Sequence, residues 1–424
     1  MREDFLHYVW KHQLFFKTNL LSTSSNKIEI ISTGNHNTNS GPDFLNAKIK
    51  IDEILWSGNV EIHVKSSDWY LHQHENDFNY DAVILHVVWE NDVAVFGKNN
   101  LPLPVLNISQ LVAKDLLNNY QKLYSKEQRW IPCEKSITTI DAFVLENWKE
   151  RLFFERLEEK SILINQLLKD SNNAYEAVLF KLLAKNFGLK TNAEAFLNFA
   201  SSIDFSILRK LQNDAFKLEA LFFGQAGFLE EKSEDKYVID LKNEYNYLKH
   251  KFKLKPIFNG QFQFFRMRPT NFPTIRIAQL STLYHQHQNL FSKLIALENL
   301  QDFYTLFSID VNDFWKTHYT FKSESKKSTK KLTKSFIDLL LINTIIPLKF
   351  NYLKSRGEVK ENDFLKLMQQ VKPEKNSIID KFKTLKVEAK NALETQSLLE
   401  LKNNYCAKKR CLQCAIGNVI LNKT

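Results

Sequence analysis

The stretch GPDFLNAKIKIDEILWSGNVEIHVK, residues 41–65, decides the fold of the amino-terminal part of the chain. Within it, residues 59–65 alternate apolar and polar side chains, which is typical of a β-strand with one buried face. Successive side chains of a strand point to opposite faces. We therefore expect one apolar face and an opposite face that carries Glu61, His63 and Lys65 together.

The sequence on both sides of this stretch predicts more strands and two flanking helices. Short β-branched runs predict strands at residues 28–32, 47–55, 59–65 and 82–89. Apolar residues at helical spacing predict helices over 3–16 and 108–124. Together these elements predict a mixed α/β domain over residues 1–130.

Beyond residue 130 the apolar residues recur every three or four positions, which is typical of amphipathic helices. This pattern predicts helices over 142–168, 174–187, 193–200, 207–211 and 219–228. The expected fold class is therefore α+β, with an amino-terminal α/β domain followed by a large, mainly helical region. We expect that region to divide into a helical domain over 131–320 and a carboxyl-terminal helical region over 321–424.

Length and charge restrict the class of protein and its partners. At roughly 150 residues per domain, 424 residues correspond to about three domains. The chain has 58 basic and 48 acidic side chains, a formal net charge of +10, and a pI near 9.1. This excess favours a polyanionic partner such as nucleic acid; the alternative is a solvated lysine surface.

Neither a membrane span nor a secretory signal is expected. A membrane span needs roughly 18 apolar residues with few charges, whereas the most apolar stretch, residues 336–350, contains Asp338, Pro347 and Lys349. The first residues, Met1-Arg2-Glu3-Asp4, carry acids where a signal peptide carries positive charge. We expect a cytoplasmic protein without a membrane partner.

Two acids near these strands suit a divalent cation. Asp43 enters one strand and Glu61 lies on the next, so adjacent pairing would bring two carboxylates together, which hard cations prefer. Such an ion polarises a phosphoryl oxygen and lowers the pKa of a bound water. We expect Asp43, Glu61 and His63 to hold the ion, with His63 as a further ligand or proton carrier and Lys65 acting electrostatically. The alternative is a surface strand with mixed charges in a non-enzymatic domain.

This arrangement resembles the PD-(D/E)XK nuclease superfamily, whose core is a small mixed sheet between helices with its motif on two adjacent strands. Pro42-Asp43 matches the first half of the motif, and Lys65 matches its last position. The second acid of that motif stands two residues before the lysine, where this chain has His63, and the acid is displaced to Glu61. The resemblance implies a restriction-endonuclease-like domain over residues 1–130 and phosphodiester hydrolysis with Mg²⁺ or Mn²⁺.

Histidines gather in the same region. Four of the 11 histidines lie between residues 63 and 86, far more than an even distribution would place there. His72 and His74 form a His-x-His pair suited to a metal or a phosphate. His86 lies in the middle of an apolar strand, which favours a hydrogen-bonded core histidine over a ligand.

The four cysteines predict a second site. Cys406, Cys411 and Cys414 cluster near the carboxyl end, and Cys133 is the other cysteine of the chain. In a chain expected to be cytosolic, clustered cysteines are more often metal ligands than disulfides. Four thiolates suit zinc or an iron–sulfur cluster and would fasten the carboxyl-terminal region to Cys133. The alternatives are three thiols with another ligand, and free buried cysteines.

A basic and aromatic segment completes the candidate nucleic-acid surface. Arg266, Arg268 and Arg276 flank a proline-stiffened segment that also contains Phe265 and Phe272. Guanidinium groups bind phosphates and aromatic rings stack on bases. The alternative is that these arginines pair with acids at a domain junction. The lysine-rich stretch 322–334 predicts a mobile loop that adds salt-dependent attraction to phosphates.

Over nearly its whole length the chain also resembles a bacterial family known as a domain of unknown function, typical of Bacteroidota. The resemblance rests on Gly41-Pro42-Asp43-Phe44, Ser67-Asp68-Trp69, Gly224-Gln225-Ala226-Gly227 and Arg268-Pro269-x-Asn271. The function expected from the residues is a metal-dependent nuclease acting on DNA or RNA. The rival is a non-catalytic nucleic-acid or ribosome-associated binding protein with a degenerate nuclease fold, and a third possibility is a helical scaffold that binds protein.

Overall fold

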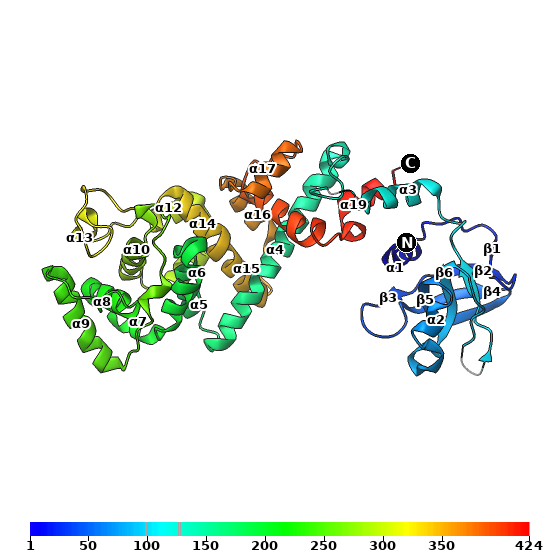
Figure 1. The fold of residues 1–424 in the computed structure, drawn as a ribbon, viewed down its shortest axis with the longest axis horizontal. Helices are drawn as coiled ribbons and strands as arrows, with labels where there is room; N and C mark the ends of the chain where they lie inside the picture. Colours follow the sequence, from blue (N-terminus) through cyan, green and yellow to red (C-terminus); the bar gives the residue numbers. More distant parts are fainter. Residues whose placement is uncertain (98–99, 126, 128, 424) are drawn as a thin grey trace. The chain divides into compact units, whose positions relative to one another are not determined.

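The computed structural model describes residues 1–97, 100–125, 127 and 129–423 (Figure 1). The chain forms two compact units. Unit 1 comprises Met1–Trp148 and Lys402–Thr424, and unit 2 comprises Lys149–Leu401. The expected α+β class is confirmed, because unit 1 contains a mixed sheet and unit 2 is helical. The predicted domain boundaries at residues 130 and 320 stay predictions.

Unit 1 is built on a seven-stranded sheet with the order β1-β2-β4-β5-β6-β7, in which β3 also pairs with β4. The strands are β1 (Leu20–Leu21), β2 (Lys27–Ser32), β3 (Asn35–His36), β4 (Phe44–Ile51), β5 (Ile54–Lys65), β6 (Val83–Glu90) and β7 (Val105–Asn107). The pairs from β1 to β5 are antiparallel, whereas β5, β6 and β7 run parallel.

The prediction of one continuous strand over residues 47–55 is wrong at its end. It is divided between β4 and β5, which form a hairpin. Asp52 occupies the turn with a left-handed backbone, φ 52°. Its carboxylate accepts hydrogen bonds from the Lys27 N–H and the Asn26 side chain, both at 2.8 Å. This local hydrogen bonding stabilises a turn where the apolar alternation predicts a continuing strand.

The helices and short helical turns of unit 1 flank the sheet. They are α1 (Glu3–Lys11), α2 (Asp68–Leu71), η1 (His74–Asn76), η2 (Phe78–Tyr80), α3 (Lys114–Leu123), η4 (Ile137–Thr139), η9 (Cys411–Gln413) and α19 (Ala415–Leu421). Helix α1 contacts β5 and buries Phe5, Leu6 and Val9. It ends before residue 16 because Gln13 has a left-handed backbone, φ 50°.

The carboxyl-terminal segment, residues 402–423, belongs to unit 1. Helix α19 packs on α3, and the Asn119 amide donates to the Lys423 carbonyl at 2.9 Å. Tyr124 Oη donates to the Lys409 carbonyl at 3.1 Å. Residues nearly three hundred positions apart are therefore packed into one unit.

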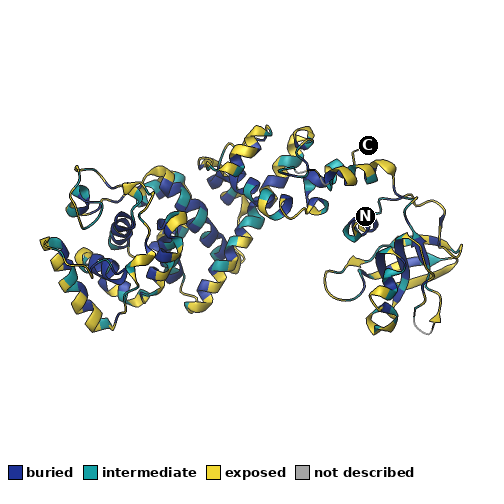
Figure 2. Ribbon diagram, in the orientation of Figure 1, coloured by how far each residue is buried: buried dark blue, intermediate teal, exposed yellow. Residues whose placement is uncertain are grey.

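Unit 2 is a helical domain with a large core rich in phenylalanine. Its helices are α4 (Ala142–Asp170, which begins in unit 1), α5 (Tyr175–Phe187), α6 (Leu189–Ser201), α7 (Phe205–Leu211), α8 (Ala215–Gln225), α9 (Lys236–Phe252), α10 (Pro273–Gln286), α11 (Leu290–Ala296), α12 (Leu300–Leu306), α13 (Asp313–Thr317), α14 (Lys334–Leu340), α15 (Ile346–Ser355), α16 (Glu361–Gln370), α17 (Ser377–Thr384) and α18 (Ala392–Glu400). Short helical turns are η5 (Asn259–Gln261) and η6 (Pro269–Asn271), and a π-helix is η7 (Leu341–Ile345); a second π-helix, η8 (Leu401–Cys406), begins at the last residue of unit 2 and continues in unit 1. Figure 2 shows that α10 is buried over almost its whole surface.

The span Lys334–Ser355, formed by α14, η7 and α15, is long and apolar enough to cross a membrane by length and composition. However, 72% of its most apolar window is buried inside the protein. A core helix passes the same test, because burial inside a protein and burial in lipid select similar residues.

Candidate metal centre

Asp43, which directly precedes β4, lies beside Glu61 of β5. The pairing of Phe44 with Val60 sets this register. The Asp43 N–H donates to Glu61 Oε2 at 3.1 Å, and the Ile62 N–H donates to Asp43 Oδ2 at 3.0 Å. The structure therefore brings together the two acids that the sequence predicts to share a cation.

Three histidines form a group beside Glu61, and two of them contact its carboxylate. Among the described residues, the nitrogens of His63, His72 and His74 form a group within 4.8 Å of one another that can hold a metal ion. His63 comes from β5, whereas His72 and His74 flank Gln73, whose left-handed backbone (φ 60°) makes a tight turn between them. The predicted His-x-His pair is thus placed beside His63.

The distances describe a site of converging ligand atoms. Glu61 Oε1 lies 3.4 Å from His63 Nε2 and 3.3 Å from His74 Nε2. His63 Nε2 lies 3.1 Å from His72 Nδ1. His74 Nε2 is buried without a hydrogen-bond partner, although a buried polar atom normally has one. A nitrogen with an unused lone pair beside a carboxylate fits a bound cation.

His86 supports His63 from behind. It is fully buried on β6, and its Nε2 lies 2.9 Å from His63 Nδ1, within hydrogen-bond distance. The parallel pairing of β5 with β6 places Glu61 opposite His86. The interpretation of His86 as a hydrogen-bonded core histidine is confirmed. Its contact orients the His63 ring, as groups behind metal-ligating histidines commonly do.

Burial sets the protonation of these groups. It raises the pKa of Glu61 to about 9, and the neighbouring charge of Asp43 adds to the effect. Burial, together with the other histidines, lowers the pKa of His63 to about 2. Burial lowers the pKa of His86 to about 3. Near neutral pH the imidazoles are therefore neutral, which is the form that binds metals.

Helix α1 adds two groups that the sequence interpretation missed. His7 Nε2 lies 3.2 Å from Asp43 Oδ2. Burial lowers the pKa of His7, but its close contact with the Asp43 carboxylate and the charge of that group outweigh burial and raise the pKa overall. Burial likewise raises the pKa of Glu3, which senses both His7 and Asp43. Glu3 and His7 are four residues apart, a spacing that puts both side chains on one face of the helix and could have identified them as a pair.

Lys65 lies at the outer end of β5. Its Nζ is 3.8 Å from Glu90 Oε2, and the side chain is half exposed. Its backbone N–H donates to Asp68 at 3.0 Å. The prediction that Lys65 acts beside the two acids is therefore corrected. Strand alternation places Lys65 on the same face as Glu61, but it lies four residues further along β5, at the end of the strand, where its ammonium pairs with Glu90.

The predicted arginine group is divided between surface and core. The Arg266 guanidinium lies 5.1 Å from the ring of Phe265, which is 76% exposed, and Arg268 is exposed too. Arg276 instead is buried on α10, 3.6 Å from the Phe336 ring centre. The expectation that Arg276 binds substrate is corrected, because a guanidinium buried in the core cannot reach a phosphate.

The lysine-rich stretch also differs from the mobile loop that its composition predicts. Lys330 is buried, and its ammonium lies 3.7 Å from the centre of the Tyr319 ring. The Gln279 amide donates to the Lys330 carbonyl at 2.7 Å. The part of the stretch around Lys330 is thus packed against the rest of unit 2.

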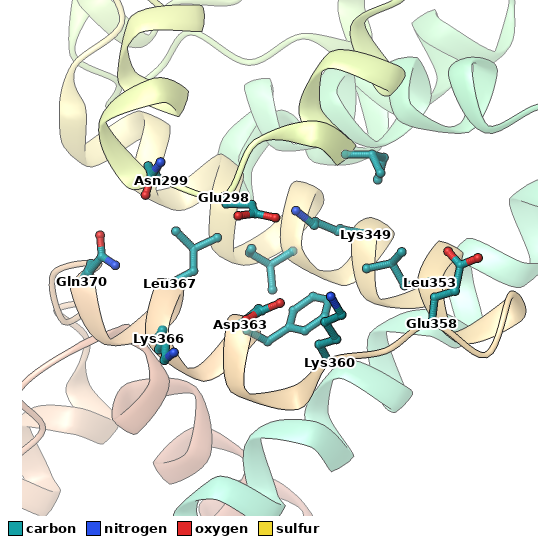
Figure 3. A pocket seen from close by; sticks show the side chains of 13 residues that line it. Glu298, Asn299, Lys349, Leu353, Glu358, Lys360, Asp363, Lys366, Leu367 and Gln370 are labelled. Carbon is teal, nitrogen blue, oxygen red and sulfur yellow. The ribbon is translucent and has the colours of Figure 1, made fainter.

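Unit 2 also contains a pocket of about 600 Å³. In Figure 3 the Glu298 carboxylate and the Lys349 ammonium face each other across it. Lys349 Nζ donates to the Leu297 carbonyl at 2.7 Å, and burial lowers the pKa of Lys349. None of the residues predicted from the sequence to form a site lines this pocket.

Comparison with known proteins gives one family. A family model described as "Protein of unknown function (DUF2851)" matches residues 3–377. No curated protein and no solved structure matches the chain. The matched range includes all of the acids and histidines described above.

Proposed function

Because this chain belongs to the DUF2851 family of proteins of unknown function, we propose its activity from the site itself: metal-dependent hydrolysis of phosphodiester bonds in nucleic acid. The observation that carries the proposal is the hydrogen bonding that joins Asp43 and Glu61, with His63 and His74 beside the Glu61 carboxylate and His72 beside His63. We also propose the cytoplasm of a Bacteroidota-type bacterium as the setting.

The topology of unit 1 supports a PD-(D/E)XK-like core. Antiparallel strands β2, β4 and β5 are followed by β6, which runs parallel to β5. Glu61 lies on β5 and Asp43 directly precedes the adjacent strand β4, close to the arrangement that the resemblance implies. We assign the second half of the motif to Glu61-Ile62-His63, so that His63 takes the place of the motif lysine.

The ligand set favours manganese over magnesium. Mg²⁺ binds oxygen ligands in a strict octahedron, whereas imidazole suits first-row transition metals better. Asp43 and Glu61 supply carboxylates, and His63, His72 and His74 supply nitrogens. When bound, such an ion polarises a phosphoryl oxygen and lowers the pKa of a bound water.

The protein groups have distinct tasks in this proposal. Asp43 and Glu61 are held in place by backbone N–H groups, and His86 orients His63. His7, whose pKa is raised beside Asp43, holds a proton that partly neutralises this carboxylate. Fixing charged groups before the reaction removes most of the reorganisation that water would require.

The test is cleavage of single- and double-stranded DNA and RNA by the purified full chain with Mn²⁺ or Mg²⁺. We expect cleavage that is faster with Mn²⁺ and is abolished by Glu61→Gln. Failure to cleave any of the four substrates with either ion contradicts the proposal.

The second candidate is non-catalytic binding of nucleic acid or of the ribosome. The observation that favours it is the position of Lys65, which pairs with Glu90 and leaves a histidine in the lysine position. Exposed Phe265, Arg266 and Arg268 in unit 2 supply a surface for phosphates and bases. Salt-sensitive binding without hydrolysis, unchanged by Glu61→Gln, selects this function.

A further inference from the structure

We propose that Cys133, Cys406, Cys411 and Cys414 hold one thiolate-bound metal centre in unit 1, either a zinc ion or an iron–sulfur cluster. The site is separate from the acids and histidines of the proposed nuclease. It fastens the carboxyl-terminal segment to the residues that follow α3.

The four cysteines come from two distant parts of the chain and lie in tight turns. The Cys133 carbonyl accepts hydrogen bonds from the Ser136 and Ile137 N–H groups, both at 2.9 Å. Cys406 ends the π-helix η8, Cys411 begins η9, and Cys414 precedes α19. A Cβ on Gly417 would meet the Cys411 carbonyl oxygen at 2.0 Å, so α19 starts directly against the Cys411 turn.

All four thiols are buried and none forms a disulfide. They are also electrostatic neighbours: Cys406 senses the other three, and Cys133 senses Cys411 and Cys414. Burial raises the pKa of Cys133 to about 12 and that of Cys411 to about 12, and the neighbouring cysteines add to both shifts. Four buried sulfurs in one place match the donor set of a metal centre, and a bound metal replaces their protons.

The surroundings suit an anionic centre. Lys402 lies where its charge lowers the pKa of Cys406, and Lys409 does the same for Cys411. Tyr124 forms a side-chain hydrogen bond with Cys411. Four thiolates around a metal centre carry a net negative charge, which nearby cations and donors stabilise.

The donor set fits two kinds of centre. Four thiolates suit a tetrahedral zinc ion or an iron–sulfur cluster, and metal analysis distinguishes the two.

The centre would reinforce contacts that already join the two segments. Lys402 Nζ donates to the Trp130 carbonyl at 2.7 Å and lies 4.8 Å from the indole ring centre. The Asn422 amide donates to the Tyr8 hydroxyl at 3.0 Å. A metal that bridges Cys133 to the three carboxyl-terminal cysteines would link the two segments of unit 1 and would therefore have a structural role.

The test is metal and acid-labile sulfide analysis of the full chain purified without oxygen, with a visible absorption spectrum before and after dithionite. We expect a stoichiometric metal. Iron with sulfide and an absorption that bleaches on reduction identify a cluster, whereas zinc without iron identifies a tetrahedral zinc site. Neither metal, with four thiols that react after mild unfolding, would overturn the centre altogether.

Variants separate this site from the proposed nuclease. Cys133→Ser is expected to lose the thiolate-bound metal and to make residues 402–423 sensitive to protease, while His72→Ala keeps that metal and loses Mn²⁺ binding. Gly417→Ala retains all four thiols but crowds the Cys411 turn, so we expect it to lower the content of the thiolate-bound metal as well. Full content of this metal in both Cys133→Ser and Gly417→Ala would contradict the assignment, whatever the nuclease assay shows.

Discussion

The carboxylates of Asp43 and Glu61 are held by each other's backbone: Glu61 accepts a hydrogen bond from the Asp43 N–H, and Asp43 accepts one from the Ile62 N–H, next to Glu61. Each carboxylate uses one oxygen in this way. Glu61 Oε1 is left facing the histidines. The pairing fixes the direction of both acids before any ligand arrives, which is the kind of preorganisation that a hydrolytic site requires.

Glu61→Gln and Lys65→Ala are expected to behave oppositely, although the two residues share a strand face. Glu61→Gln removes a proposed ligand, and we expect Mn²⁺-dependent cleavage to fall by more than about 100-fold, since even groups behind a metal ligand contribute about 10–100-fold. Lys65→Ala removes a half-exposed ion pair with Glu90, a kind of pair that contributes little, so cleavage should stay within a few-fold of wild type. Rates measured at several Mn²⁺ concentrations check both; a severe loss in Lys65→Ala would restore the lysine to the site.

His86→Gln is expected to weaken Mn²⁺ binding without removing a ligand. The change replaces the ring that holds His63 Nδ1, and loss of such an orienting group costs about 10–100-fold in metal affinity. Titration calorimetry with Mn²⁺ measures the effect. Unchanged affinity would show that His63 does not bind the ion.

The contribution of His63, His86 and Glu61 to the stability of the metal-free protein is expected to be greatest near pH 6.5. Below it, His63 and His86 stay neutral in the fold, with pKa values near 2 and 3 against 6.5 when unfolded. The unfolded chain then binds more protons, so the free energy of unfolding falls as the pH falls. Above it, Glu61 keeps its proton up to about pH 9 in the fold, against 4.5 when unfolded, so stability falls as the pH rises.

Urea denaturation of chelator-treated protein at about pH 5, 6.5 and 8.5 checks this profile. Each imidazole contributes up to about 1.4 kcal/mol per pH unit on the acid side. Mn²⁺ takes the place of the Glu61 proton and should move the maximum to higher pH. A flat profile would show that the buried groups titrate together with the unfolded chain.

Arg268→Ala and Arg276→Ala are expected to fail in different ways. Arg268 is exposed, so its loss should weaken retention of nucleic acid at low salt with little change in melting temperature. Arg276 donates to Gln279 and Asn271 in the core, so its loss leaves polar partners unpaired and should lower the melting temperature. Binding assays and thermal unfolding of both variants make the comparison; equal loss of binding with equal stability would place both arginines at the surface.

Local pattern predicted the part of the site that lies on strands. Alternation along residues 59–65 placed Glu61 and His63 on one face, and both converge on the same site. The same rule failed for Lys65, because alternation gives the face but not the distance along the strand. Asp52 shows a second limit, since its side chain stabilises a turn inside an apolar run.

The groups that the sequence did not reveal depend on tertiary packing. His7 reaches Asp43 because α1 lies on β5, a contact between segments that no local period encodes. Arg276 is buried because α10 is surrounded by other helices, so its charge is compensated by Gln279 and by the Phe336 ring instead of solvent. Charge and composition indicate a partner class, but burial decides which cations remain available to it.

The return of residues 402–423 to unit 1 gives the protein an order of assembly. A nascent chain emerges amino terminus first, so residues 1–148 leave the ribosome well before the segment that completes their unit. In the proposed metal centre, Cys133 would wait until residues 149–401 have been synthesised before Cys406, Cys411 and Cys414 could join it. A ribosome that stalls within unit 2 would release an amino-terminal sheet whose last helix, α19, is missing, and such a product is a natural substrate for cellular proteases.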